Sequence, residues 1–229
     1  MTLWRLVLVV ALSLPAGWFA ELLIVRGPTE EPLLLPLRLG GMSRRRLLTQ
    51  VFISLGFVLI TLRFDELSFG LLAGMLTLYT VLVALAIIDS ATYRLPDRIV
   101  LPMLCLSIVW ITAVALIDGN PEKIQFAICG ALVFFGTLLV AHLISPRGMG
   151  FGDVKLAALM GLFLGASSTT LMDAVVLVLW AMVIGFAMGT VAGLAILVRR
   201  GGNHPFPFGP YLAAGTMIAL LASSTFLRR

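Results

Sequence analysis

Long apolar stretches separated by short polar connectors constrain this sequence more than any other feature. Successive runs begin near Trp4, Leu47, Leu67 and Ile99, and the pattern continues to Phe226. A helix needs about 20 predominantly apolar residues to cross a bilayer, and 60% of the 229 residues are hydrophobic whereas 12% are charged. Because lipid offers no hydrogen-bond partners, each run must form a helix. The sequence therefore predicts an all-α fold, a polytopic membrane helix bundle with about eight transmembrane helices.

Charged residues, Gly and Pro mark the ends of the expected helices. The helices cover about 4–25, 47–62, 67–89, 99–117, 124–144, 153–165, 172–198 and 208–226. No soluble domain fits between them, so we expect residues 1–229 to form a single transmembrane domain whose longest polar connector is 26–46. The first run lacks a small-residue cleavage pattern like that of a secretory signal, and a retained helix is expected there.

The distribution of basic residues sets the expected orientation, because Lys and Arg gather in cytoplasmic loops. The loops after the first, third, fifth and seventh helices hold more of them than the opposite side. The first set is Arg26, Arg38, Arg44, Arg45, Arg46, Arg94, Arg98, Arg147, Lys155, Arg199 and Arg200, and the second is Arg5, Arg63, Lys123, Arg228 and Arg229. Both chain ends are therefore expected outside, with Asp89, Asp97 and Asp153 on the cytoplasmic side. Scattered basic residues with a net charge of +5 do not form a nucleic-acid-binding patch.

Several small residues are assigned to packing. Gly185, Gly189 and Gly193 recur at every fourth position of the seventh run and are expected to let another helix approach closely. Cys105 and Cys129 each lie inside an apolar run and form no CxxC pair, so neither a zinc site nor a disulfide is indicated. No metal or other cofactor is expected.

Two aspartates stand at helix ends on the same expected face. Asp89 closes the third apolar run, and Asp153 opens the sixth within the glycine-rich stretch 148–156. If packing brings them together, repulsion prevents both from ionising easily, so the pair shares one proton. One carboxyl can then activate water while the other protonates a departing amine. Gly150 and Gly152 lack Cβ atoms and leave the backbone free to approach an extended peptide.

Simpler roles compete for each acidic residue. Asp153 on its own would more often be the N-cap of the sixth helix, and Asp97, after Pro96, is expected to be the N-cap of the fourth. Glu21 lies within one turn of Arg26, so an interfacial ion pair is as good an interpretation as a place in a site. Cation-coupled transport is the alternative function, because acids within a membrane often mark ion pathways. The helix-end positions and the lack of a visible inverted repeat disfavour it.

Four stretches of the chain form an ordered set of motifs. Residues 89–97 read Asp-Ser-Ala-Thr-Tyr-Arg-Leu-Pro-Asp, residues 150–156 read Gly-Phe-Gly-Asp-Val-Lys-Leu, and residues 207–213 read Pro-Phe-Gly-Pro-Tyr-Leu-Ala. They resemble the first signature, the GxGDxKL signature and the late PFGPFLA segment of the prepilin peptidases, or type IV leader peptidases. Residues 19–28 are similar to the end of that family's first helix, FLNxxIxRxP, with Glu21 in place of the usual asparagine.

This resemblance implies a GxGD-type aspartyl protease of the bacterial inner membrane. Such enzymes cut a short basic leader from type IV prepilins or pseudopilins at the cytoplasmic border, for pilus assembly or type II secretion. The resemblance makes Asp89 and Asp153 the catalytic pair. Its substrate-binding or supporting residues would be Gly150, Gly152, Lys155, Asp97 and Glu21. Lys155 has the alternative role of extending to the membrane interface. The implied partners are a prepilin substrate helix and membrane lipid, with no nucleic acid.

One departure from the family pattern concerns a second activity. Many members carry a larger cytosolic segment after the first helix, with two CxxC pairs, that is associated with N-methylation of the new amino terminus. Here 26–46 is short and contains no cysteine, residues 33–46 resemble a trimmed remnant, and Gln50 stands where the family usually has glutamate. We therefore expect leader peptidase activity without N-methyltransferase activity.

Overall fold

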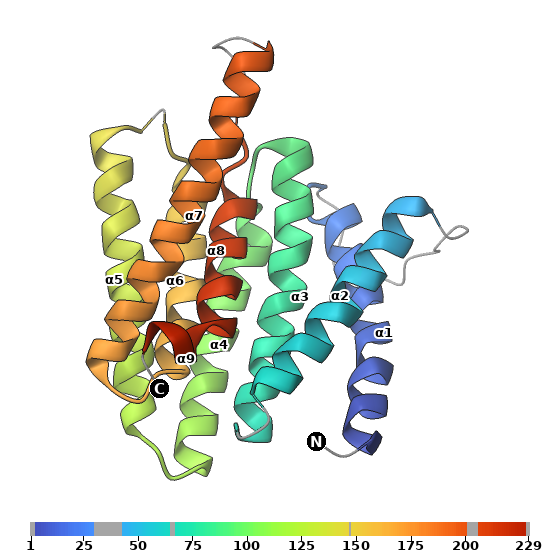
Figure 1. Cartoon of the computed structure of the whole chain (residues 1–229), viewed down its shortest axis with the longest axis vertical. Helices are drawn as coiled ribbons and strands as arrows, with labels where there is room; N and C mark the ends of the chain where they lie inside the picture. The colour runs from blue at the N-terminus through green and yellow to red at the C-terminus, as the bar shows by residue number, and fades with distance from the viewer. Residues whose placement is uncertain (1–2, 30–42, 65–66, 147, 201–205, 228–229) are drawn as a thin grey trace.

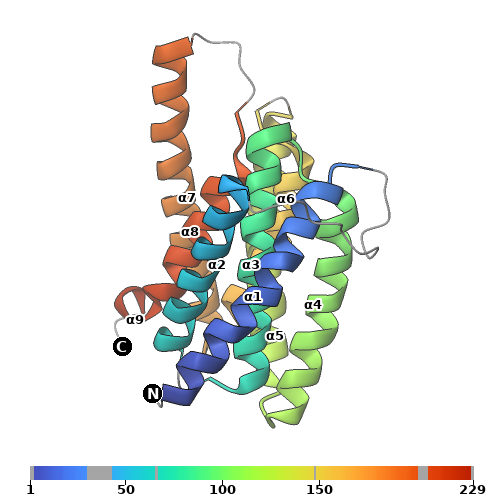
Figure 2. The same cartoon turned by 90° about the vertical axis from the view of Figure 1, so that its right-hand side faces the viewer.

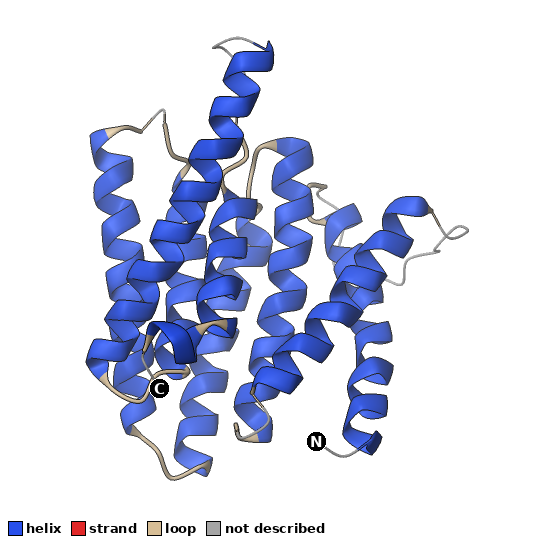
Figure 3. Ribbon diagram, viewed as in Figure 1, coloured by secondary structure: helices blue, strands red, loops and turns tan. Residues whose placement is uncertain are grey.

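The computed structural model describes residues 3–29, 43–64, 67–146, 148–200 and 206–227 (Figure 1). Its helices are α1 (Leu3–Arg26), α2 (Arg44–Arg63), α3 (Phe69–Thr92), α4 (Asp97–Ile117), α5 (Glu122–Ile144), α6 (Phe151–Ala166), α7 (Leu171–Arg200), α8 (Gly209–Leu221) and α9 (Ser223–Phe226). No strand occurs within these ranges (Figure 3). The predicted all-α membrane helix bundle is confirmed.

Six of these helices are long and apolar enough to cross a membrane, namely α1, α2, α3, α4, α5 and α7. The other two expected spans are shorter, since α6 has 16 residues and α8 has 13. The count of eight transmembrane helices is therefore not confirmed. The expected last helix is also divided at Ala222, where α8 ends and the short α9 follows.

The helices run alternately up and down the bundle (Figures 1 and 2). The C-terminal ends of α1, α3, α5 and α7 lie at one end, and α7 extends beyond the others there. The start of α1 and the short α9 lie towards the opposite end. The predicted alternation is present, and the side of the membrane that each end faces stays a prediction.

The helices α3 and α6 form the centre of the bundle. Every residue of α6 from Leu159 to Ala166 is buried, because α4, α5, α7 and α8 surround this short helix. The closest approach is between α5 and α6, where glycines meet. A Cβ added to Gly161 would lie 2.3 Å from the carbonyl oxygen of Gly130, and one added to Gly165 would lie 2.0 Å from that of Phe126. The two backbones are therefore in direct contact.

The small-residue series in α7 packs against α8 and its N-terminal connector, as predicted. A Cβ on Gly185 would lie 3.2 Å from the backbone of Leu212, and one on Gly189 would lie 2.8 Å from the ring of Phe208. Close helix packing through small residues is a common way for membrane helices to associate. This contact fixes α8, and with it the PFGP segment, against the bundle.

Glycine-to-alanine substitutions should separate the close α5–α6 contact from ordinary helix positions. Gly161→Ala and Gly165→Ala are each expected to cost about 1–3 kcal/mol of stability by forcing the backbones apart. Gly136→Ala, in α5, is the matched control because its Cβ meets nothing within 4 Å. Thermal unfolding in detergent measures the difference. Equal midpoints for Gly165→Ala and Gly136→Ala would contradict the close packing.

Candidate active site

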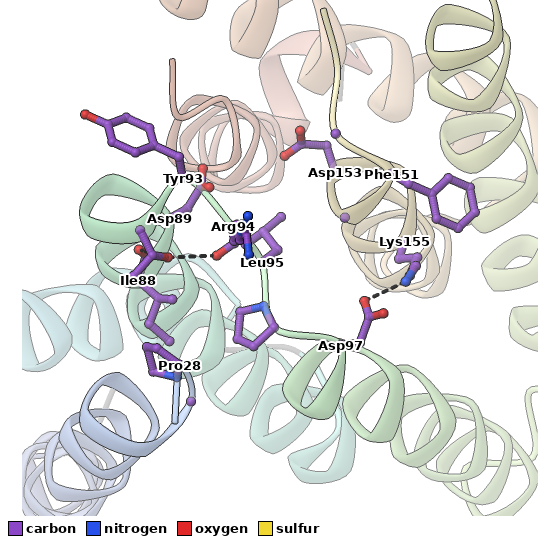
Figure 4. A pocket seen from close by; sticks show the side chains of 15 residues that line it. Pro28, Ile88, Asp89, Tyr93, Arg94, Leu95, Asp97, Phe151, Asp153 and Lys155 are labelled. Carbon is purple, nitrogen blue, oxygen red and sulfur yellow. Dashed lines mark hydrogen bonds and ion pairs between the residues drawn. The ribbon is translucent and has the colours of Figure 1, made fainter. Parts of the chain in front are cut away.

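A cavity of about 840 Å³ opens where the ends of α1, α3, α4 and α6 meet (Figure 4). Asp89 lines it from the last turn of α3, and Asp153 lines it from the first turn of α6. In Figure 4 the side chain of Asp153 points across the cavity towards the side where Asp89 lies. Packing therefore brings into one cavity the two acids that the sequence singles out. Their catalytic role stays a prediction.

Asp89 does not end α3, which continues for three more residues to Thr92. Tyr93 then takes the left-handed conformation, with φ of 55°, and turns the chain towards Leu95 and Pro96, which also line the cavity. This placement puts the Asp89 carboxyl on the helix itself rather than on a loop, so its position is set by the packing of α3.

Asp89 is 5% exposed, and its carboxyl is held by the N-terminus of α8. The backbone N–H of Gly209 donates a hydrogen bond of 3.0 Å to Asp89 Oδ2. Gly209 is the first residue of α8, where amides have no partner within the helix and favour a negative charge. A Cβ at this position would lie 2.9 Å from the same oxygen. The glycine of the PFGP motif therefore permits the contact.

Asp153 does not cap α6, so that structural interpretation is wrong. The N-cap is Gly150, and no side chain makes a capping bond there. Asp153 is 7% exposed, and its Oδ1 is buried without a hydrogen-bond partner in the described ranges. An unsatisfied buried polar atom is costly. A carboxyl in this setting is suited to exchanging protons with a molecule in the cavity.

The electrostatics of Asp153 favour its protonated form. It lies in α6, outside the six membrane-crossing candidates. Burial is the main cause that raises the pKa of Asp153 from 3.8 to about 7, the charge of Asp89 raises it further, and the amide of Gly150 opposes the rise. Near neutral pH the protonated form of Asp153 is therefore well populated.

Asp97 and Lys155 form an ion pair at the edge of the same cavity (Figure 4). Lys155 Nζ lies 2.5 Å from Asp97 Oδ1 and 5.1 Å from the ring centre of Phe151. The expectation that Asp97 caps α4 is wrong, because Pro96 is the N-cap and makes no side-chain capping bond. The pair ties the start of α4 to the start of α6 and so fixes the helix that carries Asp153.

Glu21 forms an ion pair rather than part of the cavity wall. Its Oε1 lies 2.5 Å from Arg45 Nη2 of α2, and the described residues that line the cavity do not include it. Glu21 thus forms an ion pair with a residue of another helix, and the pair with Arg26 that the sequence suggested stays a prediction. Gly27 and Pro28, just after α1, do reach the cavity. Residues 19–28 therefore contribute to the site through Gly27 and Pro28, the last two residues of that segment.

Sequence reasoning missed three contacts around the cavity. His142 Nδ1 lies 2.8 Å from the carbonyl oxygen of Met149, which fixes the connector next to Gly150. A Cβ on Gly152 would lie 3.0 Å from Leu95 Cβ, so this glycine also serves close packing with the loop after α3. The third contact is the hydrogen bond from the Gly209 N–H to Asp89. The PFGP motif was a signal for Gly209, whereas nothing local in the sequence indicates the other two contacts.

No group of three or more His, Cys, Asp or Glu residues is arranged to hold a metal in the described part of the chain. Cys105 and Cys129, from α4 and α5, are not joined in a disulfide.

The fold and the acidic cavity together define a multi-pass membrane protein with its site at one end of the bundle. The model of the type IV leader peptidase family matches residues 76–194, a range that contains both Asp89 and Asp153. The chain belongs to the type IV leader peptidase family.

Curated relatives carry the name prepilin leader peptidase/N-methyltransferase. The protein from Stutzerimonas stutzeri is 32% identical over 171 residues, 68% of this chain and 56% of the relative. Those from Aeromonas salmonicida strain A449 and Escherichia coli K12 are 31% and 33% identical, over 82% and 66% of this chain and 62% and 64% of the relatives. The chain thus spans less than two thirds of the length of these relatives. No solved structure matches it.

The raised pKa of Asp153 predicts a cost to stability that depends on pH. The folded protein holds this proton more tightly than the unfolded chain, so the free energy of unfolding decreases as pH rises from 3.8 to about 7 and stays lower above that. Asp153→Asn is therefore expected to stabilise the protein above pH 7. The gain is at most about 4 kcal/mol, because a tenfold difference in proton affinity between the folded and unfolded states corresponds to about 1.4 kcal/mol.

Thermal unfolding in detergent across this pH range measures the effect. The gain should vanish towards pH 3.8, where the carboxyl is protonated in both states. Asp118→Asn, at the exposed C-terminal end of α4, is the matched control and should not show this pH-dependent gain in stability. A variant at position 153 that is less stable than the natural protein above pH 7 would contradict the burial argument.

Proposed function

We propose that this protein is a membrane-embedded aspartyl endopeptidase that removes the short basic leader from type IV prepilins or pseudopilins. The supporting observation is the single cavity lined by Asp89 and Asp153, each within one of the two family signatures. One carboxyl accepts an amide hydrogen bond and the other has an unpartnered oxygen. The names of the curated relatives agree with this activity.

We propose different roles for the two acids, because their environments differ. Asp89 receives the Gly209 N–H, a donor that favours a carboxylate, and acts as the base that takes a proton from water. Asp153 carries the shared proton and acts as the acid. The water oxygen bonds to the peptide carbonyl carbon, the C–N bond breaks, and the departing amine receives the proton from Asp153. No other reactant is needed.

The cavity wall suits an extended peptide. Gly150 presents backbone without a side chain to the cavity, and Gly152 lets Leu95 of the loop after α3 pack directly beside it. An extended peptide segment can lie along such a wall, because the backbone groups of the wall are accessible to those of the peptide. The ion pair between Lys155 and Asp97 at the edge closes this side of the cavity.

We also propose that the protein resides in the bacterial inner membrane with the cavity facing the cytoplasm and both chain ends outside. The cavity lies at the end of the bundle where α2 begins with Arg44, Arg45 and Arg46, and basic residues favour the cytoplasmic side. Arg38 and Arg147, which belong to the same charge pattern, and His204 lie outside the described residues.

The proposed activity does not include N-methylation. The segment 26–46 contains no cysteine, and its residues 30–42, with most of the region that resembles a trimmed remnant, lie outside the described residues. Cation-coupled transport, the alternative from sequence, finds no support in the family match.

Removal of either acid is expected to abolish cleavage. Asp89→Asn and Asp153→Asn should each lower the rate by at least about a thousandfold, because hydrolysis needs both the base and the acid. The assay incubates the purified protein in detergent with a prepilin and follows the loss of a leader-sized mass. Asp118→Asn is the control and should keep full activity. A fully active variant at position 89 or 153 would contradict the proposal.

The same assay can follow pH. Since Asp153 must carry the proton and its pKa is about 7, the rate of cleavage is expected to fall as pH rises through that value. The ratio kcat/KM is the quantity to compare, because its pH dependence reports the pKa of groups in the free protein. A rate that instead increases above pH 7 would assign the acid role to another group.

A further inference from the structure

A second hollow, of about 620 Å³, lies between α2, α3 and α8. We call it the α2–α8 groove. Its wall is apolar over nearly all of its surface, and it includes Leu48, Phe52 and Leu55 of α2, Leu82 of α3, and Ala214 and Met217 of α8. In Figure 1, α2 crosses the bundle obliquely and its start lies away from α8. The groove therefore occupies the space that the tilt of α2 leaves open.

The groove has the shape that a helix requires. The residues that each wall contributes recur at three- or four-residue spacing, as with Leu48, Phe52 and Leu55 in α2. One face of each of three helices thus points into the same space, and the side chains form ridges and grooves to which a further helix can pack. From Arg45 to Leu55 the wall extends about 15 Å along α2, which matches two to three turns of a helix.

The polar groups of the wall are already satisfied within the protein. The Tyr79 hydroxyl donates to the carbonyl oxygen of Phe52 at 2.9 Å, and the Thr49 hydroxyl donates to that of Arg45 at 3.0 Å. An occupant consequently needs no hydrogen-bonding groups along its length. The groove suits an uncharged, apolar helix.

One end of the groove is the candidate active site. In α3 the groove face that includes Leu82 and Ala86 continues to Asp89, seven and three residues further on. In α8 the face that includes Ala213 begins four residues earlier, at Gly209. These two end residues are joined by the 3.0 Å hydrogen bond from Gly209 N to Asp89 Oδ2. A helix in the groove would therefore begin beside the Asp89 carboxyl.

The charge of the wall is confined to the same end. Arg45 lines the groove there, its side chain is 52% exposed, and one nitrogen is 2.5 Å from Glu21. A guanidinium has five N–H donors, so others can reach backbone carbonyls of an unwound segment that enters the cavity. The opposite end of α2 is closed against α8, because Arg63 Nε donates to the carbonyl oxygen of Leu221 at 2.9 Å.

We propose that the α2–α8 groove binds the first two to three turns of the substrate's apolar helix, directly after the leader, and so presents the leader junction to Asp89 and Asp153. This inference rests on the proposed function. The groove supplies most of the recognition through apolar packing, and the cavity positions only the extended segment. Specificity then depends on an apolar helix that follows the junction at once.

Photo-crosslinking tests the docking independently of cleavage. A photoreactive phenylalanine analogue in place of Ala214, in an Asp153→Asn background that retains the substrate, is reconstituted in liposomes with a full-length prepilin. The same analogue in place of Leu132, a 64% exposed residue of α5, is the control. We expect an adduct with the substrate from position 214 and none from 132. Adducts at position 214 with lipid alone, or with a second copy of the chain, would overturn the proposal.

A bulky side chain tests the consequence for turnover. Ala214→Trp fills the groove and is expected to lower cleavage of the full-length prepilin at low substrate concentration by at least about tenfold. Ile128→Trp is the matched control, because it fills the smaller apolar hollow between α4, α5 and α6, and its cleavage should equal that of the natural protein. Equal cleavage by Ala214→Trp would overturn the docking proposal. If the natural protein cleaves no prepilin, the proposed function fails, and the adduct at position 214 still decides the docking.

Discussion

The hydrogen bond from the Gly209 amide to Asp89 connects the candidate site to the rest of the bundle. It depends on the close approach of α3 and α8, which a Cβ at position 209 would prevent. The approach depends in turn on α7, where Gly185 lies against the backbone of Leu212 and holds α8 in place. Because a buried carboxylate is costly without a donor, this chain of contacts is what allows an acid to remain in the interior.

Asp153, the second acid, is positioned by a different set of contacts. The short α6 is surrounded by other helices, and its contact with α5 requires glycine on both sides. Asp153 is therefore carried on a rigid helix whose start is fixed by the pair of Lys155 and Asp97. Rigid placement leaves one oxygen unsatisfied. The unpartnered oxygen lowers the stability of the folded protein, and it also leaves the carboxyl able to exchange a proton. Such a combination is common for functional groups in folded proteins.

The parts of the structure that sequence could predict are those determined locally. Hydropathy locates the helices, and the two signatures locate Asp89 and Asp153, because both patterns lie within short stretches. Long-range partners were not predictable. Asp97 pairs with Lys155 rather than capping its own helix, and Glu21 pairs with Arg45 from α2. The glycines that join α5 to α6 were likewise not predictable, since a glycine within an apolar run carries no sign of the helix that it contacts. The catalytic roles of the two acids remain predictions.

The Gly209 contact also bears on how the protein is made. Asp89 enters the membrane early, and its amide donor follows 120 residues later in the chain. Synthesis proceeds from the N-terminus, so the nascent polypeptide holds an acid without its donor until α8 has been made. The donor that accompanies the buried Asp89 carboxyl is therefore in place only after nearly the whole bundle has been synthesised.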